Sequence, residues 1–461
     1  MKKFLETMGT PLGVSVGALV WMLMGLMPVH AEVSEAEAAK LGSSLTPVGA
    51  ERAGNADGTI PAWEGGVAKP PAGWSPGDAR VDLFADDEKL FSIDSTNVAK
   101  YASKLTPGQQ ALVGKYDGYR MDVYPSRRSC AYPQAVYDGT RRNATTAKLD
   151  ENGDLVAGIG GFLFPMPQSG AEAVWNHKSR YEGRGYKGRV ATAGVTKNGN
   201  YDMSVLERDT YSDFYDPKNK SLADLDNIAG RWVQRVVEPV TEAGNLTLIH
   251  ETVNGPRLTW IYAAGSRRIR RLPNFEYDNP VNGTEGLLTT DQANMYNGRL
   301  DRYNWELKGK RELYIPYNDA ELHSPEHSYA EILTPQFPKR DLFRYELHRV
   351  WHVTATIKPQ FRHVYSRREF FLDEDSWIIS VADLYDSRGE LWRVQEAPIG
   401  NIYELPACVT QAQFHYDLNA KQYIASQLKN QEPGYDYLAG EEGRIDESKF
   451  TPGYLQLVGR R

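Results

Sequence analysis

Four short apolar segments follow one another in residues 348–396, with only turns between them. Val, Ile, Tyr, Trp and Phe dominate these segments, as is typical of β-strands. Pro359 should end the first strand, because proline has no backbone N–H to donate to a ladder. Asp373–Ser376 and Asp386–Gly389 offer the side chains that favour turns. The pattern predicts an antiparallel meander, and we expect the acidic turn at Asp373 to be solvated.

Other stretches extend this pattern. Residues 190–197 and 201–210 alternate around Asn198–Asn200, which predicts a hairpin. Further strands are predicted at 245–253, 257–263, 303–317 and 413–418. Side chains that cap helices precede three predicted helices: Ser34 with Glu37, Thr106 with Pro107, and Ser169. Residues 222–238 are also predicted to be helical.

These elements divide the chain into three regions after the N-terminal segment. Residues 32–185 include a Gly- and Pro-rich stretch at 45–66 and are predicted to form an arm and a helical cap, with Trp63 as the anchor of the arm. Residues 186–435 should form the sheet, and residues 436–461 a polar tail. The predicted fold class is α+β. One large antiparallel sheet is curved as an open half-barrel and carries helices on its concave face.

The N-terminus has the features of a secretory signal peptide. Lys2 and Lys3 precede an uncharged apolar run at 14–27, and Val29 and Ala31 suit a cleavage site after residue 31. The alternative is a membrane anchor, but the run is short for a span of about 20 residues. We therefore expect an exported protein whose residues 1–31 are removed, and no later segment reaches transmembrane length.

Composition narrows the possible partners and linkages. The net charge is −7 with both signs interspersed, which argues against nucleic acid as a partner. The two cysteines, Cys130 and Cys408, permit one disulfide in an oxidising compartment. Two buried thiols are the alternative, and the sequence does not decide between them. Cysteines so far apart give no zinc-ligand spacing.

No motif in the sequence indicates catalysis, a cofactor or a metal. There is no G-x-S-x-G, H-E-x-x-H or P-loop pattern. His348 and His352 would lie roughly 13 Å apart on a strand that rises about 3.3 Å per residue, which is too far to share one ion. His363 stands further along the chain. The acidic turn lacks the ligand spacing of an EF-hand loop.

Four blocks of sequence together resemble a known family. They are residues 43–66, residues 124–133 (YPSRRSCAYP), residues 161–183 and residues 367–393. In this order they resemble the DUF1329 family of Gram-negative bacteria, which is grouped with the LolA/LolB-like periplasmic proteins that sort outer-membrane lipoproteins. The resemblance implies a half-barrel around an apolar cavity and a periplasmic carrier of a lipid, an acyl chain or another lipophilic molecule. It also implies an RND-type inner-membrane exporter and an outer-membrane protein as partners.

The carrier hypothesis singles out residues that could contact such a ligand. A cavity lining is predicted at Trp260, Tyr262, Trp351, Val353, Ile357, Trp377, Ile379 and Val381. The alternative for each is ordinary core beneath a helix. A lipid headgroup or membrane surface could be contacted by Arg267, Arg268, Arg270 and Arg271, although such a run is also typical of a solvated edge strand.

Two other classes of function stay open. A ligand-free scaffold subunit of an envelope complex would have a collapsed concave face. A carbohydrate-active protein would have two carboxylates about 5–10 Å apart in a polar cleft. A non-catalytic carrier in the periplasm is the function that the sequence favours.

Overall fold

A sheet of 16 strands organises the part of the chain that the computed structural model describes, residues 33–78 and 80–459. Along its main path the strands are β1 (Phe91–Ile93), β2 (Met121–Val123), β12 (Tyr345–Ile357), β13 (Arg367–Asp373), β14 (Ile379–Tyr385), β15 (Leu391–Glu396), β18 (Gln413–Asp417), β19 (Gln422–Leu428), β5 (Lys187–Val195), β6 (Tyr201–Tyr211), β7 (Ile228–Glu238), β8 (Leu246–Thr252), β9 (Leu258–Ala263) and β10 (Arg268–Leu272). Off this path, β11 (Tyr303–Pro316) pairs with β12, and β20 (Gly434–Asp436) pairs with β5. The path ends at β1 and β10, so the sheet is open, as the half-barrel prediction requires.

Strands β12 to β15 are neighbours in sequence order, which confirms the predicted meander. The predicted hairpins β5–β6 and β8–β9 are confirmed as well. The strand pairings described in the large sheet are antiparallel, apart from the parallel contact between Tyr345 of β12 and Val123 of β2. Through this contact the N-terminal region contributes strands to the sheet.

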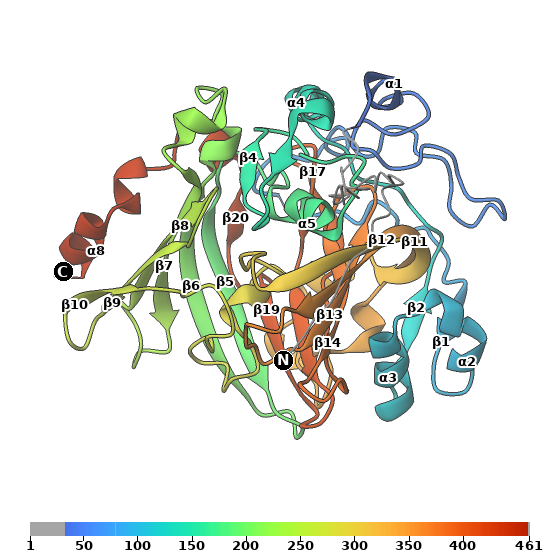
Figure 1. The fold of residues 1–461 in the computed structure, drawn as a ribbon. Helices are drawn as coiled ribbons and strands as arrows, with labels where there is room; N and C mark the ends of the chain where they lie inside the picture. Colours follow the sequence, from blue (N-terminus) through green and yellow to red (C-terminus); the bar gives the residue numbers. More distant parts are fainter. Residues whose placement is uncertain (1–32, 79, 460–461) are drawn as a thin grey trace, which may run out of the picture. The chain divides into compact units, whose positions relative to one another are not determined.

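Helices cover both faces of the sheet. Figure 1 shows α5 (Gly170–Lys178) in the hollow between strands β5–β8 and strands β12–β13. There Ala173 and Val174 join a core cluster with Val353 of β12. On the other face, α3 (Pro107–Lys115) packs against β14 and β15, and Leu112 shares a second cluster with Val394. The α+β half-barrel with a helix on its concave face is confirmed, and α3 in addition covers the outer face.

The remaining elements lie outside the large sheet. The other helices are α1 (Glu35–Ala38), α2 (Val98–Tyr101), α4 (Gln134–Thr146), α6 (Tyr329–Ile332), α7 (Leu438–Glu441) and α8 (Pro452–Val458). Two small sheets pair β3 (Lys148–Leu149) with β4 (Leu155–Ala157) and β16 (Ile399–Ile402) with β17 (Ala407–Thr410). The predicted N-caps Ser34, Thr106 and Ser169 all accept a backbone hydrogen bond.

The predicted helix at 222–238 is wrong. Leu222–Leu225 forms one 3₁₀ turn, and the left-handed backbone at Asp226 and Asn227 ends it. The following residues form β7, which pairs with β6 and β8 along its length. Trp232, Val233 and Val236 are of types that suit a strand between two partners, so sheet pairing decides the conformation here.

Residues expected to form a polar tail instead pack on the sheet. Ile445, Phe450 and Leu455 are buried against Leu248 of β8 and Tyr262 of β9. The described residues belong to one compact unit from Val33 onward. The predicted signal peptide, residues 1–31, lies outside the described residues. Among those that are described, no helix combines the length and the apolar character that a membrane crossing requires.

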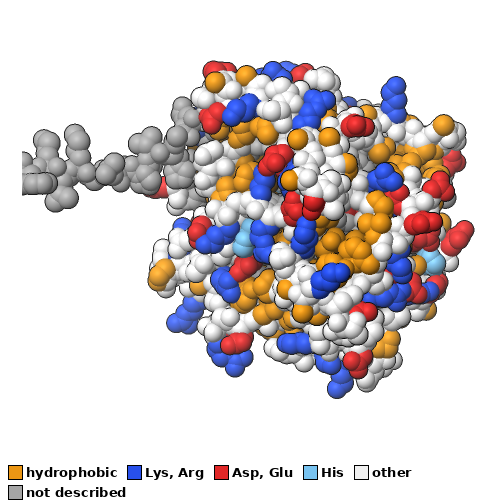
Figure 2. Space-filling model, turned by 90° about the vertical axis from the view of Figure 1, so that its right-hand side faces the viewer, with side chains coloured by type: hydrophobic (Ala, Val, Ile, Leu, Met, Phe, Trp, Pro, Cys, Tyr) orange, Lys and Arg blue, Asp and Glu red, His pale blue; other side chains and the backbone are white. Residues whose placement is uncertain are grey.

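Figure 2 shows one face of the molecule in space-filling form, viewed from the right-hand side of Figure 1. Acidic and basic side chains are interspersed over this face, with apolar side chains between them. Neither sign of charge forms a continuous patch on it, as the mixed charge pattern of the sequence predicts.

Candidate functional site

The residues predicted to line a cavity are split between two packed clusters. Six of them belong to or pack against the core under α5: Trp351, Val353, Ile357, Trp377, Ile379 and Val381. Trp377 stacks on Trp351 with 6.0 Å between ring centroids, and its Nε1 donates to the carbonyl of Val48 at 2.9 Å. In this conformation these side chains contact the chain's own segments, and none of the six lines the two cavities described below.

The other two predicted lining residues lie at the opposite end of the sheet. Tyr262 is buried beneath α8, and its hydroxyl donates to the carbonyl of Gly459. Trp260 is half buried, with its ring edge-on to His250 at 5.1 Å. The structure therefore brings the eight residues together only in part, and a shared ligand surface stays a prediction.

The four arginines lie at the open end of the sheet. Arg268, Arg270 and Arg271 are exposed on β10, and Arg267 is in the turn before it. Within the described residues none of the four forms an ion pair. This position suits a solvated edge strand, where charge opposes pairing with another sheet, and a headgroup contact stays a prediction.

The two cysteines lie together. Their Cα atoms are 5.5 Å apart, and the structure joins Cys130 to Cys408 by a disulfide. Cys408 belongs to β17, and Cys130 follows β2, so the bond connects the N-terminal region to a hairpin far along the chain. Trp63 Nε1 donates to the carbonyl of Cys130 at 3.0 Å, so the predicted anchor of the arm lies at the same point.

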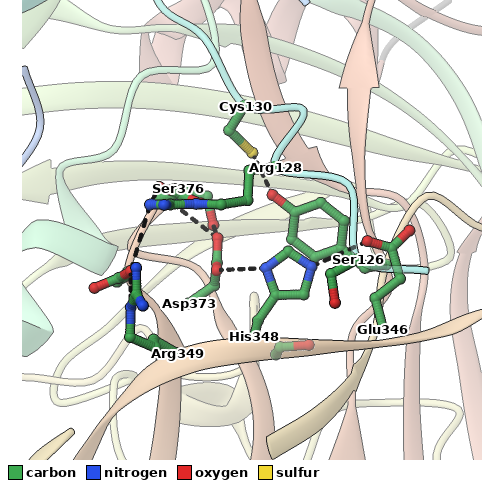
Figure 3. A network of polar contacts seen from close by, with 12 residues as sticks. Ser126, Arg128, Cys130, Glu346, His348, Arg349, Asp373 and Ser376 are labelled. Atoms are coloured by element: carbon green, nitrogen blue, oxygen red, sulfur yellow. Dashed lines mark hydrogen bonds and ion pairs between the residues drawn. The ribbon is translucent and has the colours of Figure 1, made fainter. Parts of the chain in front are cut away.

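A buried histidine forms the centre of a polar network (Figure 3). His348 on β12 has Nε2 at 3.1 Å from Glu346 and Nδ1 at 3.5 Å from Asp373. Tyr317 stacks on the imidazole with 4.1 Å between ring centroids. Burial alone would lower the pKa of His348, but the two carboxylates outweigh it and raise that pKa to about 9. The ring is therefore an imidazolium at neutral pH.

The acidic turn continues this network and is buried, so the expectation of a solvated turn is wrong. Arg128 binds both oxygens of Asp375, at 2.7 and 2.8 Å. Glu374 accepts hydrogen bonds from Arg349 at 2.8 Å and from Lys310 at 2.7 Å. Charges leave water when each finds a partner, and here the partners come from distant segments that the turn's own sequence does not reveal.

Three ligand atoms in this network lie close enough to hold a metal ion. Those of His348, Asp373 and Asp375 are all within 4.8 Å of one another. Arg128 already engages both oxygens of Asp375, and the protonated ring of His348 offers no lone pair. The donor set thus fits an ion-pair network better than a metal site.

A large open groove lies beside β20 and the ends of β5 and β6, with a cavity volume of about 1140 Å³. Its wall carries the aromatic rings of Trp74, Tyr435 and Tyr437 next to charged side chains. Two of its ion pairs are Lys449 with Asp209 at 2.7 Å and Arg444 with Asp436. We call this surface the polar groove. It is formed by residues 74–78 and 80 and by segments near residues 187–189, 207–209, 323–325, 404–411 and 429–449.

A smaller cavity of about 180 Å³ lies over β6, β7 and β8. Lys178 of α5 reaches its wall beside Trp232 and Tyr296. Burial lowers the pKa of Lys178 to about 8, and its Nζ donates to the carbonyl of Gly298 at 2.8 Å. This cavity lies beside α5, whose Lys178 lines it together with residues of β6, β7 and β8.

The sequence did not predict the polar groove. Its wall residues are isolated in the sequence and follow no motif, so only the fold brings them together. The nearest signal was the predicted arm at 32–185, whose residues 74–78 and 80 form one edge of the groove.

Comparison with known proteins places the chain in a family. The model of DUF1329, described as a protein of unknown function, matches residues 92–456. The chain belongs to the DUF1329 family. This DUF1329 chain is also similar to the uncharacterized protein PA3922 of Pseudomonas aeruginosa, at 43% identity over 461 residues, with 98% of this chain and 99% of the relative covered. The family suggested by the four sequence blocks is confirmed.

Three solved structures resemble parts of the DUF1329 chain. A putative outer membrane lipoprotein-sorting protein domain from Vibrio parahaemolyticus matches with a TM-score of 0.42 and 11% identity, covering 62% of this chain and 97% of its own. A DUF1329 family protein from Desulfovibrio piger gives 0.40 and 11%, covering 59% and 92%. A LolA superfamily protein, NE2245 from Nitrosomonas europaea, gives 0.36 and 12%, covering 62% and 100%. At such identities no residue role transfers to this chain.

Proposed function

We propose that this DUF1329 protein binds an amphipathic, lipid-type molecule in the polar groove and acts as a carrier without catalysing a reaction. The observation that carries the proposal is the groove itself. Ligand pockets commonly have volumes of about 300–1,000 Å³, so a cavity of about 1140 Å³ has room for a molecule of lipid size. Its wall carries both aromatic rings and charged groups, which suits a molecule with both an apolar and a polar part.

The ion pairs of the wall support binding to a preformed surface. Lys449 with Asp209 and Arg444 with Asp436 connect the C-terminal segment to β6 and β20. A wall that is already held by its own contacts loses little conformational freedom when a ligand binds. The groove is thus suited to hold a molecule and release it unchanged.

The compartment and partners belong to the same proposal. An exported carrier of an amphipathic molecule would act in the periplasm, where such molecules must cross an aqueous space between two membranes. An RND-type exporter and an outer-membrane protein are the partners that would supply and receive the cargo. The signal-like N-terminal sequence supports the proposed compartment.

The test is native mass spectrometry of the protein purified from a Gram-negative periplasm, followed by organic extraction and identification of released compounds. We expect an additional mass on the wild type. Glu432→Trp should remove it by filling the groove, since Glu432 lies on its wall. Glu390→Trp, in the exposed turn between β14 and β15, is the matched control and should keep the mass.

One alternative has an observation in its favour. The hollow of the sheet is largely filled by the chain's own core around Val353, Trp377 and Ile379. A filled concave face is what the scaffold alternative predicts. A wild-type protein that stays bare after exposure to an envelope lipid extract would overturn the carrier proposal and favour the scaffold. Equal loading of Glu432→Trp and wild type would show that any ligand binds outside the groove.

A further inference from the structure

Three basic side chains from separate segments converge on one corner of the polar groove. Arg80 comes from the arm, His323 from the segment after β11, and Lys429 from the end of β19. Burial holds the pKa of His323 well below its usual value, and the charges of Lys429 and Arg80 lower it further, so the ring is neutral. The two remaining cations, Lys429 and Arg80, repel each other unless an anion offsets their charge.

The corner holds little negative charge of its own. Glu404 Oε2 lies 3.7 Å from Arg80 Nη2, which is an ion pair without a hydrogen bond. Glu182 also acts on Lys429, but Arg180 already binds it at 2.7 Å. Among the described residues, the Lys429 amine has no ion pair and no hydrogen bond.

Several polar atoms here lack a partner. Both ring nitrogens of His323 and the hydroxyl of Tyr435 are buried without a hydrogen bond in the described part of the chain. A buried polar atom left unsatisfied costs about 1–3 kcal/mol, so structures retain few of them without a reason. The Tyr435 hydroxyl and the His323 ring can each donate a hydrogen bond, as the head of an acidic ligand would require.

We infer that this corner binds the anionic head group, a carboxylate or a phosphate, of the molecule that occupies the polar groove. The inference rests on the proposed function and names the chemistry of its ligand. Lys429 supplies the charge, while His323 and Tyr435 donate hydrogen bonds. The Lys429 Nζ lies 5.6 Å from the centroid of the Tyr435 ring, and Tyr437 continues the aromatic wall 6.0 Å beyond. The apolar part of the ligand lies along these rings.

Binding of the anion at this corner is also coupled to protonation of the Lys429 amine. Burial, followed by the charge of Arg80, lowers the pKa of Lys429 to about 7, while Glu182 and Glu404 act in the opposite direction. An anion beside the amine favours the ammonium form, so the Lys429 amine takes up a proton from the solvent as the ligand binds. Affinity should therefore be highest below pH 7 and decrease as the pH rises through that value.

Isothermal titration calorimetry on the full mature chain tests the inference with four probes: dodecanoate, dodecyl phosphate, dodecanol and inorganic phosphate. We expect the two anionic amphiphiles to bind about tenfold or more tightly than dodecanol, because a charge-assisted hydrogen bond is worth about 1.5–3 kcal/mol. The tighter of the two identifies the head group. Lys429→Met should abolish this preference while leaving dodecanol binding unchanged.

Lys197→Met is the matched control, since Lys197 lies in the exposed β5–β6 turn and should behave as wild type. If Lys429→Met does not fold, His323→Leu replaces it: this change removes one of the proposed donors and should reduce the preference for the two anions over dodecanol. Equal affinity for dodecanol and the anions, unchanged by Lys429→Met, would overturn this inference and leave the proposed function standing. Binding of none of the amphiphiles would overturn both. Inorganic phosphate binding as tightly as dodecyl phosphate would overturn the assignment of an amphipathic ligand.

Discussion

At the scale of single residues, His348 places a positive charge in the buried core of the described chain. Its imidazolium lies between Glu346 and Asp373, away from water. In the unfolded chain a histidine has a pKa of about 6.5, whereas in the folded protein the pKa is about 9. The folded state thus binds this proton more tightly. The resulting stabilisation is fully present below pH 6.5 and is lost as the pH rises through 9.

The change His348→Gln should remove this pH dependence. The shift of the pKa corresponds to about 3 kcal/mol of stability below pH 6.5, and the variant also leaves the buried carboxylate of Asp373 without its ion-pair partner, whereas Glu346 keeps Arg344 at 2.7 Å. We expect its free energy of unfolding in urea to be lower than that of the wild type by several kcal/mol at pH 6 and by less at pH 9. His352→Gln, on the same strand and half exposed, is the control.

Other groups titrate in this pH range, so the informative quantity is the difference between wild type and variant. Burial raises the pKa of Asp383 and lowers that of Lys178, and both lie between 6.5 and 9. They contribute equally to both proteins. A difference in unfolding free energy that stays constant from pH 6 to 9 would contradict a charged His348.

Only some contacts of the His348 network could be predicted from the sequence. Glu346 and His348 are two residues apart, and the strand predicted from His348 in fact begins at Tyr345 as β12, so the two side chains share a face. Asp373 joins them only through the register of β12 with β13, where Val350 lies opposite Asp373. Arg128 comes from more than two hundred residues away in the sequence. Neighbours within a strand were predictable, and partners across the fold were not.

At the scale of elements, α3 shows how local sequence and tertiary contact combine. Thr106 and Gln109 form a capping box, and Pro107 begins the helix. Asp383 of β14 then accepts hydrogen bonds from the Thr106 hydroxyl at 3.0 Å and the Gly108 amide at 2.9 Å. The helix N-terminus is therefore fixed to the sheet at a point where it approaches β14 and β15 closely.

This close approach makes Gly108 sensitive to substitution. A Cβ at Gly108 would lie 2.1 Å from Asp383 Oδ1 and 2.8 Å from Val394 Cγ2. We expect Gly108→Ala to destabilise the protein by about 1–3 kcal/mol through overpacking. Gly114→Ala, in the same helix, meets nothing within 4 Å and should stabilise by roughly 0.5–1 kcal/mol. Urea unfolding of both variants measures the contrast.

Equal effects of the two substitutions on the free energy of unfolding would contradict the packing of α3 on the sheet.

The same elements show where prediction from sequence succeeds. Capped helices and Asn-Gly hairpins carry local signals, and α3 and β5–β6 follow them. Strand β7 carries a weaker local signal, and its two neighbours in the sheet decide its conformation. The wall of the polar groove has no local signal, since its segments meet only in the folded chain.

At the scale of the whole molecule, contacts near the disulfide connect the N-terminal arm to the rest of the fold. The Ser129 carbonyl accepts hydrogen bonds from the Val67 amide at 2.7 Å and from Asn401 Nδ2 at 2.9 Å. The arm, the segment after β2 and the β16–β17 hairpin thus meet at one point. Cys130 and Cys408 add a covalent bond there, across 278 residues of sequence.

Because the bond closes such a long loop, its main effect should be on the unfolded chain. In the chain-entropy model, a loop of this length corresponds to about 5 kcal/mol of stability. We expect the reductant dithiothreitol to lower the free energy of unfolding by that order. The double variant Cys130→Ala/Cys408→Ala should match the reduced wild type and should not respond to reductant.

Ligand binding separates this role from a direct role in the groove. The disulfide lies outside the wall of the polar groove, so the folded double variant should bind amphiphiles as the wild type does. Alkylation of the unfolded, unreduced protein followed by mass measurement verifies that both thiols are joined. If the joined and the reduced proteins unfold at the same denaturant concentration, the noncovalent contacts around Ser129 already persist in the unfolded chain, and the bond adds no further constraint.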